Sequence, residues 1–126
     1  MKKQVTSPTA PAAIGPYSQA IETEHTVYCS GQLGIDPTIN ALAGDSVEDQ
    51  THQALRNMQE IMAATGLTLA DVVKTTVFLK NMYDFAAMNE IYSTYFSQPY
   101  PARSTIEVAA LPKNGRVEIE CIAIKK

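Results

Sequence analysis

The sequence of 126 residues contains no tryptophan and only two cysteines, Cys29 and Cys121. These cysteines show no CxxC spacing and are too few for a disulfide framework or a zinc site, so we expect reduced thiols packed as small core residues. No apolar run approaches the roughly 18 residues that a membrane span requires. The N-terminal stretch MKKQVTSPTAPAA lacks the apolar core of a signal peptide. These absences favour a cytoplasmic protein without a membrane partner.

Positive charge is also scarce, because ten Lys and Arg stand against thirteen Asp and Glu, a formal net charge of -3. No run of basic residues is long enough to follow a phosphate backbone, which argues against nucleic acid as a partner. His25 and His52 have no acidic or cysteine residues at ligand spacing, and GxSxG, P-loop and HExxH motifs are absent. We therefore expect no metal ion.

What the chain does have is the composition of a globular protein, with 45% hydrophobic and 18% charged residues. Its length lies near the commonest size of a domain, so one hydrophobic core is expected. We predict a single domain over residues 1–126.

Hydrophobic periodicity, helix caps and turn residues predict the order of elements. The predicted elements are a hairpin of strands at 17–23 and 26–30, a loop at 31–45, a helix from the Ser46 cap to Gly66, a strand at 72–80, a helix at 84–96, and strands at 103–111 and 116–124 joined by a turn at Asn114 and Gly115. This order of strands, helix, strand, helix and strands predicts an α+β fold with a mixed β-sheet.

The strand at 72–80 is predicted to lie centrally in the sheet, with Val73, Thr75, Val77 and Leu79 on one face. Two helices can cover one face of such a sheet, whereas the strands carry apolar residues on both faces. The uncovered face is therefore expected to contact other subunits, and we predict an oligomer.

The last two strands carry the charged residues best suited to catalysis. Because alternate residues of a strand share a face, Arg103, Thr105 and Glu107 point one way. Glu118 and Glu120 also share a face, about 6.5 to 7 Å apart. Burial and like charge both raise the pKa of a carboxyl group, which suits a general base. The same periodicity also fits a solvated edge strand on which Arg103 merely pairs with the two glutamates.

Five motifs occur together in one order along the chain. They are APAAIGPYSQA at 10–20, CSGQLGIDP at 29–37, VVKTTVFLKNMYDFAAMNEIY at 72–92, YPARSTIEVAALP at 100–112 and VEIECIAI at 117–124. With these motifs the chain closely resembles the RidA family, also called YjgF-like proteins, from the first strand to the last. Several motifs in the right order are far more specific than any one of them.

The resemblance implies a chorismate-mutase-like α+β fold with two helices on one face of the sheet, assembled as a homotrimer with active sites in the clefts between subunits. It also implies hydrolytic deamination of the enamines and imines that pyridoxal phosphate enzymes release, namely 2-aminoacrylate/2-iminopropanoate and 2-aminocrotonate/2-iminobutanoate. The products are 2-oxo acids and ammonia, and no cofactor is expected.

By motif, Arg103 matches the arginine that holds the substrate carboxylate, and Glu118 matches the glutamate that positions and activates the attacking water. The positions that line or adjoin the pocket in the family match Tyr17, Ser30, Gly31, Asn89 and Lys74. Tyr17 and Lys74 also fit roles in packing or at a trimer interface. Thr105 stands where many relatives have cysteine, so the resemblance implies a backbone contact there that does not depend on the side chain.

Two other functions remain open from the sequence. A non-catalytic trimer would bind a 2-oxo acid in the same cleft without turning it over, and the presence of both Arg103 and Glu118 favours the enzyme over this alternative. An endoribonuclease activity has also been attached to relatives, but the acidic balance and the absence of a basic stripe argue against it.

Overall fold

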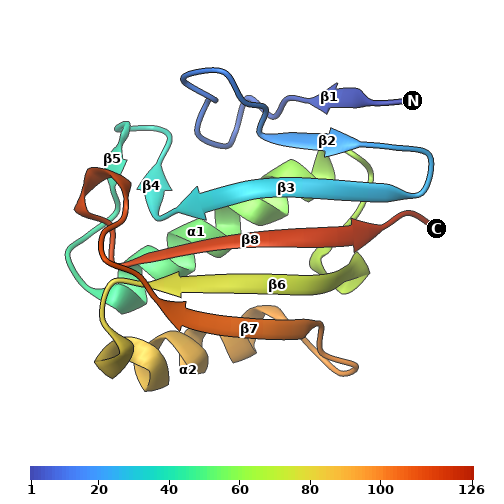
Figure 1. Ribbon diagram of the computed structural model, residues 1–126. Coiled ribbons are helices and arrows are strands. Elements are labelled where there is room, and N and C mark those ends of the chain that lie inside the picture. The colour runs from blue at the N-terminus through green and yellow to red at the C-terminus, as the bar shows by residue number, and fades with distance from the viewer.

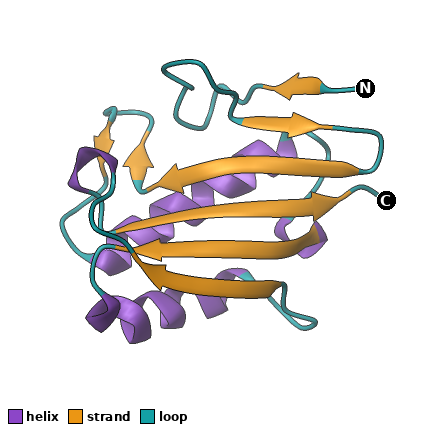
Figure 2. Ribbon diagram, in the orientation of Figure 1, coloured by secondary structure: helices purple, strands orange, loops and turns teal.

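The computed structural model describes all 126 residues. Figure 1 and Figure 2 show one sheet with both α-helices behind it. The elements are β1 (Lys3–Val5), β2 (Ala20–Glu22), β3 (Thr26–Leu33), β4 (Ile35–Asp36), β5 (Ala41–Leu42), α1 (Val47–Ala63), β6 (Val72–Leu79), α2 (Phe85–Tyr95), β7 (Ala102–Glu107) and β8 (Val117–Ile124). Short 3-10 helices occupy Leu69–Asp71, Met82–Asp84 and Pro112–Asn114. The predicted α+β class is confirmed.

The six-stranded sheet has the order β1-β2-β3-β8-β6-β7. Strands β6 and β7 are parallel because α2 crosses between them, whereas the other neighbours are antiparallel. The sheet is therefore mixed, and β6 is an internal strand, as predicted. Strand β8 is inserted between β3 and β6, so the turn at Asn114 and Gly115 joins two strands that do not pair.

Local signals explain where the first helix begins and ends. The Ser46 hydroxyl accepts a hydrogen bond from the Asp49 backbone N–H, as the predicted cap requires. Gly66 has a φ of +79°, a conformation that favours glycine after a helix end. Thr68 and Asp71 form a reciprocal capping box around the following 3-10 turn. Neither α-helix is long and apolar enough to cross a membrane.

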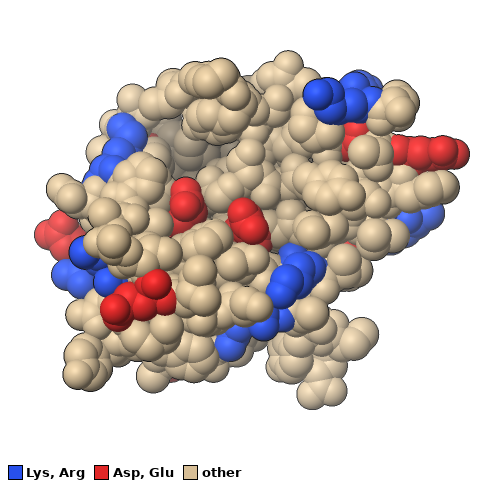
Figure 3. Space-filling model, in the orientation of Figure 1, with Lys and Arg blue, Asp and Glu red and all other residues tan.

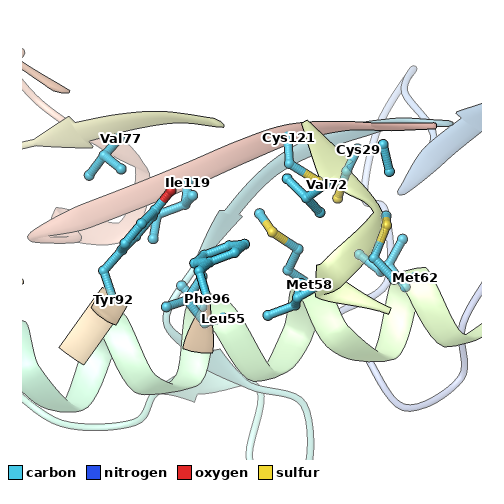
Figure 4. Packing of buried hydrophobic residues seen from close by; sticks show 14 of the residues in the cluster. Cys29, Leu55, Met58, Met62, Val72, Val77, Tyr92, Phe96, Ile119 and Cys121 are labelled. Carbon is cyan, nitrogen blue, oxygen red and sulfur yellow. The ribbon is translucent and has the colours of Figure 1, made fainter. Parts of the chain in front are cut away.

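One cluster of 23 buried apolar residues forms the core between the sheet and the helices. Leu55, Met58 and Met62 of α1 pack there against strand residues, and Tyr92 and Phe96 project from the α2 side (Figure 4). Cys29 and Cys121 are free thiols within this cluster, directly opposite each other on β3 and β8. They are small core residues, as predicted.

The structure corrects the prediction at several places, including strand β1, which the sequence did not predict, and β7, which ends at Glu107 instead of residue 111. Strand β3 runs on to Leu33 because Gln32 and Leu33 pair with β8, and the rest of the predicted loop contains the β4–β5 hairpin. Tyr17 precedes the first strand of the predicted hairpin, which begins only at Ala20. A register shift between Val72 and Lys74 buries Val72 and leaves Val73 46% exposed. Val73 therefore does not share the buried face of β6.

The face of the sheet opposite the helices has no covering element, and Figure 3 views the molecule from that side. Most of the surface visible there belongs to uncharged residues. Strand alternation places on this face the half-buried or exposed side chains of Tyr28, Phe78, Ile106, Ile122 and Ile124. The predicted apolar open face is thus present.

Candidate active site

Arg103 lies on β7, the edge strand, and points toward the helices. Its register partner on β6 is Thr75, which is fully buried on the helix side of the sheet. The Arg103 Nη1 group donates a 2.7 Å hydrogen bond to Asn89 Oδ1 of α2. The Arg103 Cζ atom also lies 4.7 Å from the ring centroid of Tyr92 and 5.5 Å from that of Phe85. Helix α2 therefore supplies both the hydrogen-bond partner and the two aromatic neighbours of the guanidinium.

An open pocket of about 440 Å³ adjoins this arginine. It is lined by Asn89, Tyr92, Ser93, Tyr100, Pro101 and Arg103. Only one guanidinium N–H group is used by Asn89, so others remain for a ligand. A planar cation at the wall of a pocket is suited to a carboxylate, which guanidinium groups bind through two parallel hydrogen bonds.

Glu118 lies on β8 but on the opposite, open face of the sheet. Its neighbours along the strand, Val117 and Ile119, point into the core, so Glu118 must point away from the helices. Burial raises the pKa of Glu118 above its usual range, and the negative charge of Glu120 raises it further. Such a carboxylate is a better proton acceptor near neutral pH than an ordinary glutamate.

Gly31 provides the space in which the Glu118 side chain lies. A β-carbon added at Gly31 would lie 2.8 Å from Glu118 Cδ, closer than side chains tolerate. Gly31 and Ser30 occupy the register shift at which β3 departs from regular pairing with β8. The irregularity lets the backbone of β3 approach the carboxylate.

Ser30 connects this region to the segment that contains Tyr17. The Ser30 hydroxyl donates a 2.6 Å hydrogen bond to the Ser18 carbonyl, and the Ser30 N–H donates to the Gln19 carbonyl. Tyr17 lies next to these residues and is 52% exposed, with its hydroxyl accepting a hydrogen bond from the Ile14 N–H. The structure thus places Ser30 and Gly31 beside Glu118, and Tyr17 is joined to them through its neighbour Ser18.

Thr105 and Lys74 differ in how they relate to these groups. Thr105 shares the helix-facing side of β7 with Arg103, and its buried Oγ1 atom has no hydrogen-bond partner. Lys74 lies on the open face of β6, where its Nζ donates a 3.3 Å hydrogen bond to Ser104 Oγ. Thr105 therefore belongs with Arg103 and Asn89, whereas Lys74 contacts neither Arg103 nor Glu118.

Arg103 and Glu118 do not meet within one chain. The residue of β8 level with Arg103 is Cys121, two strands away, and Glu118 lies three residues farther along β8. Standard strand spacings then place the two Cα atoms about 14 Å apart, with side chains on opposite faces of the sheet. A single small molecule cannot contact both side chains of the same chain.

Phe85 and Tyr92 were not among the site residues predicted from the sequence. With Asn89 they occupy positions i, i+4 and i+7, which share one face of a helix. That spacing, anchored on Asn89, is the signal by which they could have been found.

The Arg103 pocket and the Glu118 carboxylate define the class of the protein. It is a small α+β protein with an arginine pocket on one side of its sheet and a half-buried glutamate on the other. Residues 7–125 match the profile of the family described as Endoribonuclease L-PSP. The chain belongs to this family, that of RidA and YjgF-like proteins, and the resemblance drawn from its motifs is confirmed.

Curated relatives match over almost the whole chain. The 2-iminobutanoate/2-iminopropanoate deaminase of Mus musculus is 50% identical over 99% of this chain and 93% of its own length. The chloroplastic Reactive Intermediate Deaminase A of Arabidopsis thaliana is 53% identical over 97% of this chain, which spans 65% of that longer relative. The crystal structure of RidA from the Antarctic bacterium Psychrobacter sp. PAMC 21119 superposes with a TM-score of 0.94 at 46% identity, covering 98% of this chain and 99% of that one.

Proposed function

We propose that the protein hydrolyses the imines of small 2-oxo acids, and their enamine tautomers, to 2-oxo acids and ammonia. The substrates are 2-iminopropanoate (2-aminoacrylate) and 2-iminobutanoate (2-aminocrotonate). The observation that carries this proposal is the near-full-length, 50% identity to a protein named for this deaminase activity. The chain also retains Arg103 in a pocket and Glu118 in a setting that raises its pKa.

The proposed active site is shared between two subunits of a homotrimer. The separation of Arg103 and Glu118 within one chain supports this arrangement, because a second copy must bring the missing side chain to each site. The uncovered apolar face of the sheet supplies a surface that association would remove from water. A chorismate-mutase-like trimer satisfies both requirements, with each chain acting as a single domain over residues 1–126.

In this site Arg103 binds the substrate carboxylate through the guanidinium N–H groups that Asn89 leaves free. The imine carbon is bonded directly to the carboxylate carbon, so fixing the carboxylate also fixes the reacting atom. Holding the reactants in this geometry replaces a bimolecular encounter by an effectively unimolecular step. Thr105 contributes its backbone at the same edge of the pocket.

Glu118 of the adjacent chain holds the attacking water. As the water oxygen bonds to the imine carbon, Glu118 accepts one water proton and the imine nitrogen takes a proton from solvent, which produces a tetrahedral amino alcohol. The protonated Glu118 then returns its proton to the nitrogen, the carbon–nitrogen bond breaks with release of ammonia, and the hydroxyl proton passes to solvent as the carbonyl forms. General-base assistance of this kind contributes about 10²- to 10⁴-fold to the rate.

The remaining proposed residues shape the Glu118 side of the cleft. Gly31 leaves room for the carboxylate, Ser30 holds the β3 irregularity to the preceding segment, and Tyr17 presents an exposed aromatic ring nearby. Lys74 lies farther along the open face, where it adjoins the subunit interface. No cofactor enters this chemistry. The cytoplasmic location stays a prediction, and one relative is named as chloroplastic.

The test adds the purified protein to threonine dehydratase that generates 2-aminocrotonate, and measures the release of ammonia and 2-oxobutanoate. Wild-type protein should accelerate release above spontaneous hydrolysis, and Arg103→Ala and Glu118→Gln should each abolish the acceleration. Arg56→Ala and Glu48→Gln are matched controls on the exposed side of α1 and should retain it. No acceleration by the wild type, combined with saturable 2-oxo acid binding, would establish the non-catalytic trimer instead.

The family description, Endoribonuclease L-PSP, names a second candidate function. The net charge of -3 is unfavourable for binding RNA, and the open face is largely uncharged. RNA cleavage that survives further purification and disappears in Glu118→Gln would favour that function over imine hydrolysis.

A further inference from the structure

The contacts around Tyr92 link a strand, a helix and the site arginine. The Tyr92 hydroxyl shares a 2.8 Å hydrogen bond with Thr75 Oγ1, and Thr75 is the register partner of Arg103 on the neighbouring strand. The centroid of the Tyr92 ring lies 4.7 Å from Arg103 Cζ, and the ring also packs against that of Phe96, with centroids 4.5 Å apart. Figure 4 shows Tyr92 reaching from α2 to the sheet, with Phe96 beside it. The ring is therefore held at its hydroxyl end and along its side.

We propose that Tyr92 is a positioning residue that orients the Arg103 guanidinium for carboxylate binding, with Thr75 holding the ring in place. This inference rests on the proposed function, in which Arg103 binds the substrate carboxylate. Tyr92 itself takes no part in proton transfer.

An unrestrained arginine loses much rotamer freedom when it forms a two-point contact with a carboxylate. In this structure the rotamer freedom of Arg103 is already restricted without a ligand. Asn89 fixes one guanidinium nitrogen, and the Tyr92 and Phe85 rings both lie within cation–π distance of the guanidinium carbon. Preorganisation of this kind raises affinity without adding a ligand contact.

The buried hydroxyl pair explains why this position carries tyrosine rather than phenylalanine. A tyrosine hydroxyl is neutral near pH 7, and burial raises the pKa of Tyr92 further, so the phenol keeps the proton for its hydrogen bond with Thr75. Phenylalanine would keep the ring but leave the Thr75 hydroxyl unpaired in the core. Ring and hydroxyl thus have separable effects, which two substitutions can distinguish.

The experiment measures 2-oxobutanoate affinity and the KM and kcat of imine hydrolysis for Tyr92→Leu and Tyr92→Phe. Loss of the ring should weaken 2-oxobutanoate binding by about 5- to 30-fold, the range of a partly desolvated cation–π contact. KM should rise more than kcat falls, because the carboxylate is bound before and during the reaction. Tyr92→Phe should restore most of the affinity, since the ring remains.

Tyr95→Leu is the matched control, because it makes the same change on the same helix. Tyr95 contacts His52 of α1 and does not contact Arg103. It should lower thermal stability as Tyr92→Leu does, with affinity changed less than about twofold. Equal losses of stability with unchanged affinity in both variants would show that Tyr92 is only a packing residue.

A second readout follows Arg103 without any substrate. The Nε–Hε nuclear magnetic resonance of Arg103, identified by its loss in Arg103→Lys, should be displaced by the ring current of Tyr92. It should move toward the ordinary arginine position in Tyr92→Leu and stay in place in Tyr95→Leu. An unchanged resonance in Tyr92→Leu overturns the positioning role. If the wild type neither hydrolyses imines nor binds 2-oxo acids, the proposed function fails, while this resonance still decides whether Tyr92 orients Arg103.

Discussion

Complementation between two inactive variants is the most direct test of a site shared between subunits. Arg103→Ala removes the carboxylate ligand and Glu118→Gln removes the base, so each homotrimer should lose nearly all activity. Losing two charge-assisted hydrogen bonds at Arg103 costs about 3 to 6 kcal/mol, which corresponds to a decrease in kcat/KM of at least roughly 100-fold. Neither side chain packs in the central core, so both variants should fold.

Mixed trimers should regain activity in a predictable amount. At each interface a working site needs Arg103 from a Glu118→Gln chain and Glu118 from an Arg103→Ala chain. In a cyclic trimer assembled at random from equal amounts, every mixed trimer contains one such site, and about one quarter of all sites are complete. Equal mixing should therefore restore about one quarter of the wild-type activity.

The assay refolds the two variants together and measures 2-oxobutanoate release with threonine dehydratase as the imine source. Light scattering reports whether three chains associate, and separately refolded variants mixed afterwards serve as the control for exchange. A site contained within one chain gives mixed trimers no complete site. Activity that stays at the sum of the two parents, despite verified mixed trimers, would refute the shared site.

Three further predictions concern the Glu118 side of the cleft and the core. Glu120→Gln should move the acidic limb of the pH profile of kcat/KM to lower pH, because Glu118 acts as a carboxylate and removing the adjacent negative charge lowers its raised pKa. An acidic limb at the same pH would show that the charge of Glu120 does not affect the pKa of Glu118. Gly31→Ala should lower kcat/KM strongly with little change in melting temperature, since the new methyl group displaces the Glu118 carboxylate, and full activity would contradict that crowding. Leu55→Ala should reduce the free energy of unfolding by about 2 to 5 kcal/mol in a denaturant titration, because the side chain is fully buried, and a loss below ~1 kcal/mol would contradict the described packing.

Much of the local structure follows from the sequence. Ser46 marks the start of α1 because its hydroxyl satisfies a free N–H group, and the Thr68 and Asp71 pair forms a capping box for the same reason. Alternation also predicts that Arg103 and Thr105 share a face of their strand, and that Glu118 and Glu120 share a face of theirs. These features depend on neighbours a few residues apart, and the motifs that identify the family can likewise be read along the chain.

Long-range pairing decided what the sequence alone left undetermined. Strand β3 extends through Gly31 to Leu33 because β8 offers a pairing edge, which no local signal near Gly31 reveals. The register shift beside Val73 reverses its face for the same reason. Strand periodicity shows which residues share a face but not which face the helices cover. Only the tertiary structure places Arg103 beneath α2 and Glu118 on the open side, because that choice depends on strand order and on where the two helices pack.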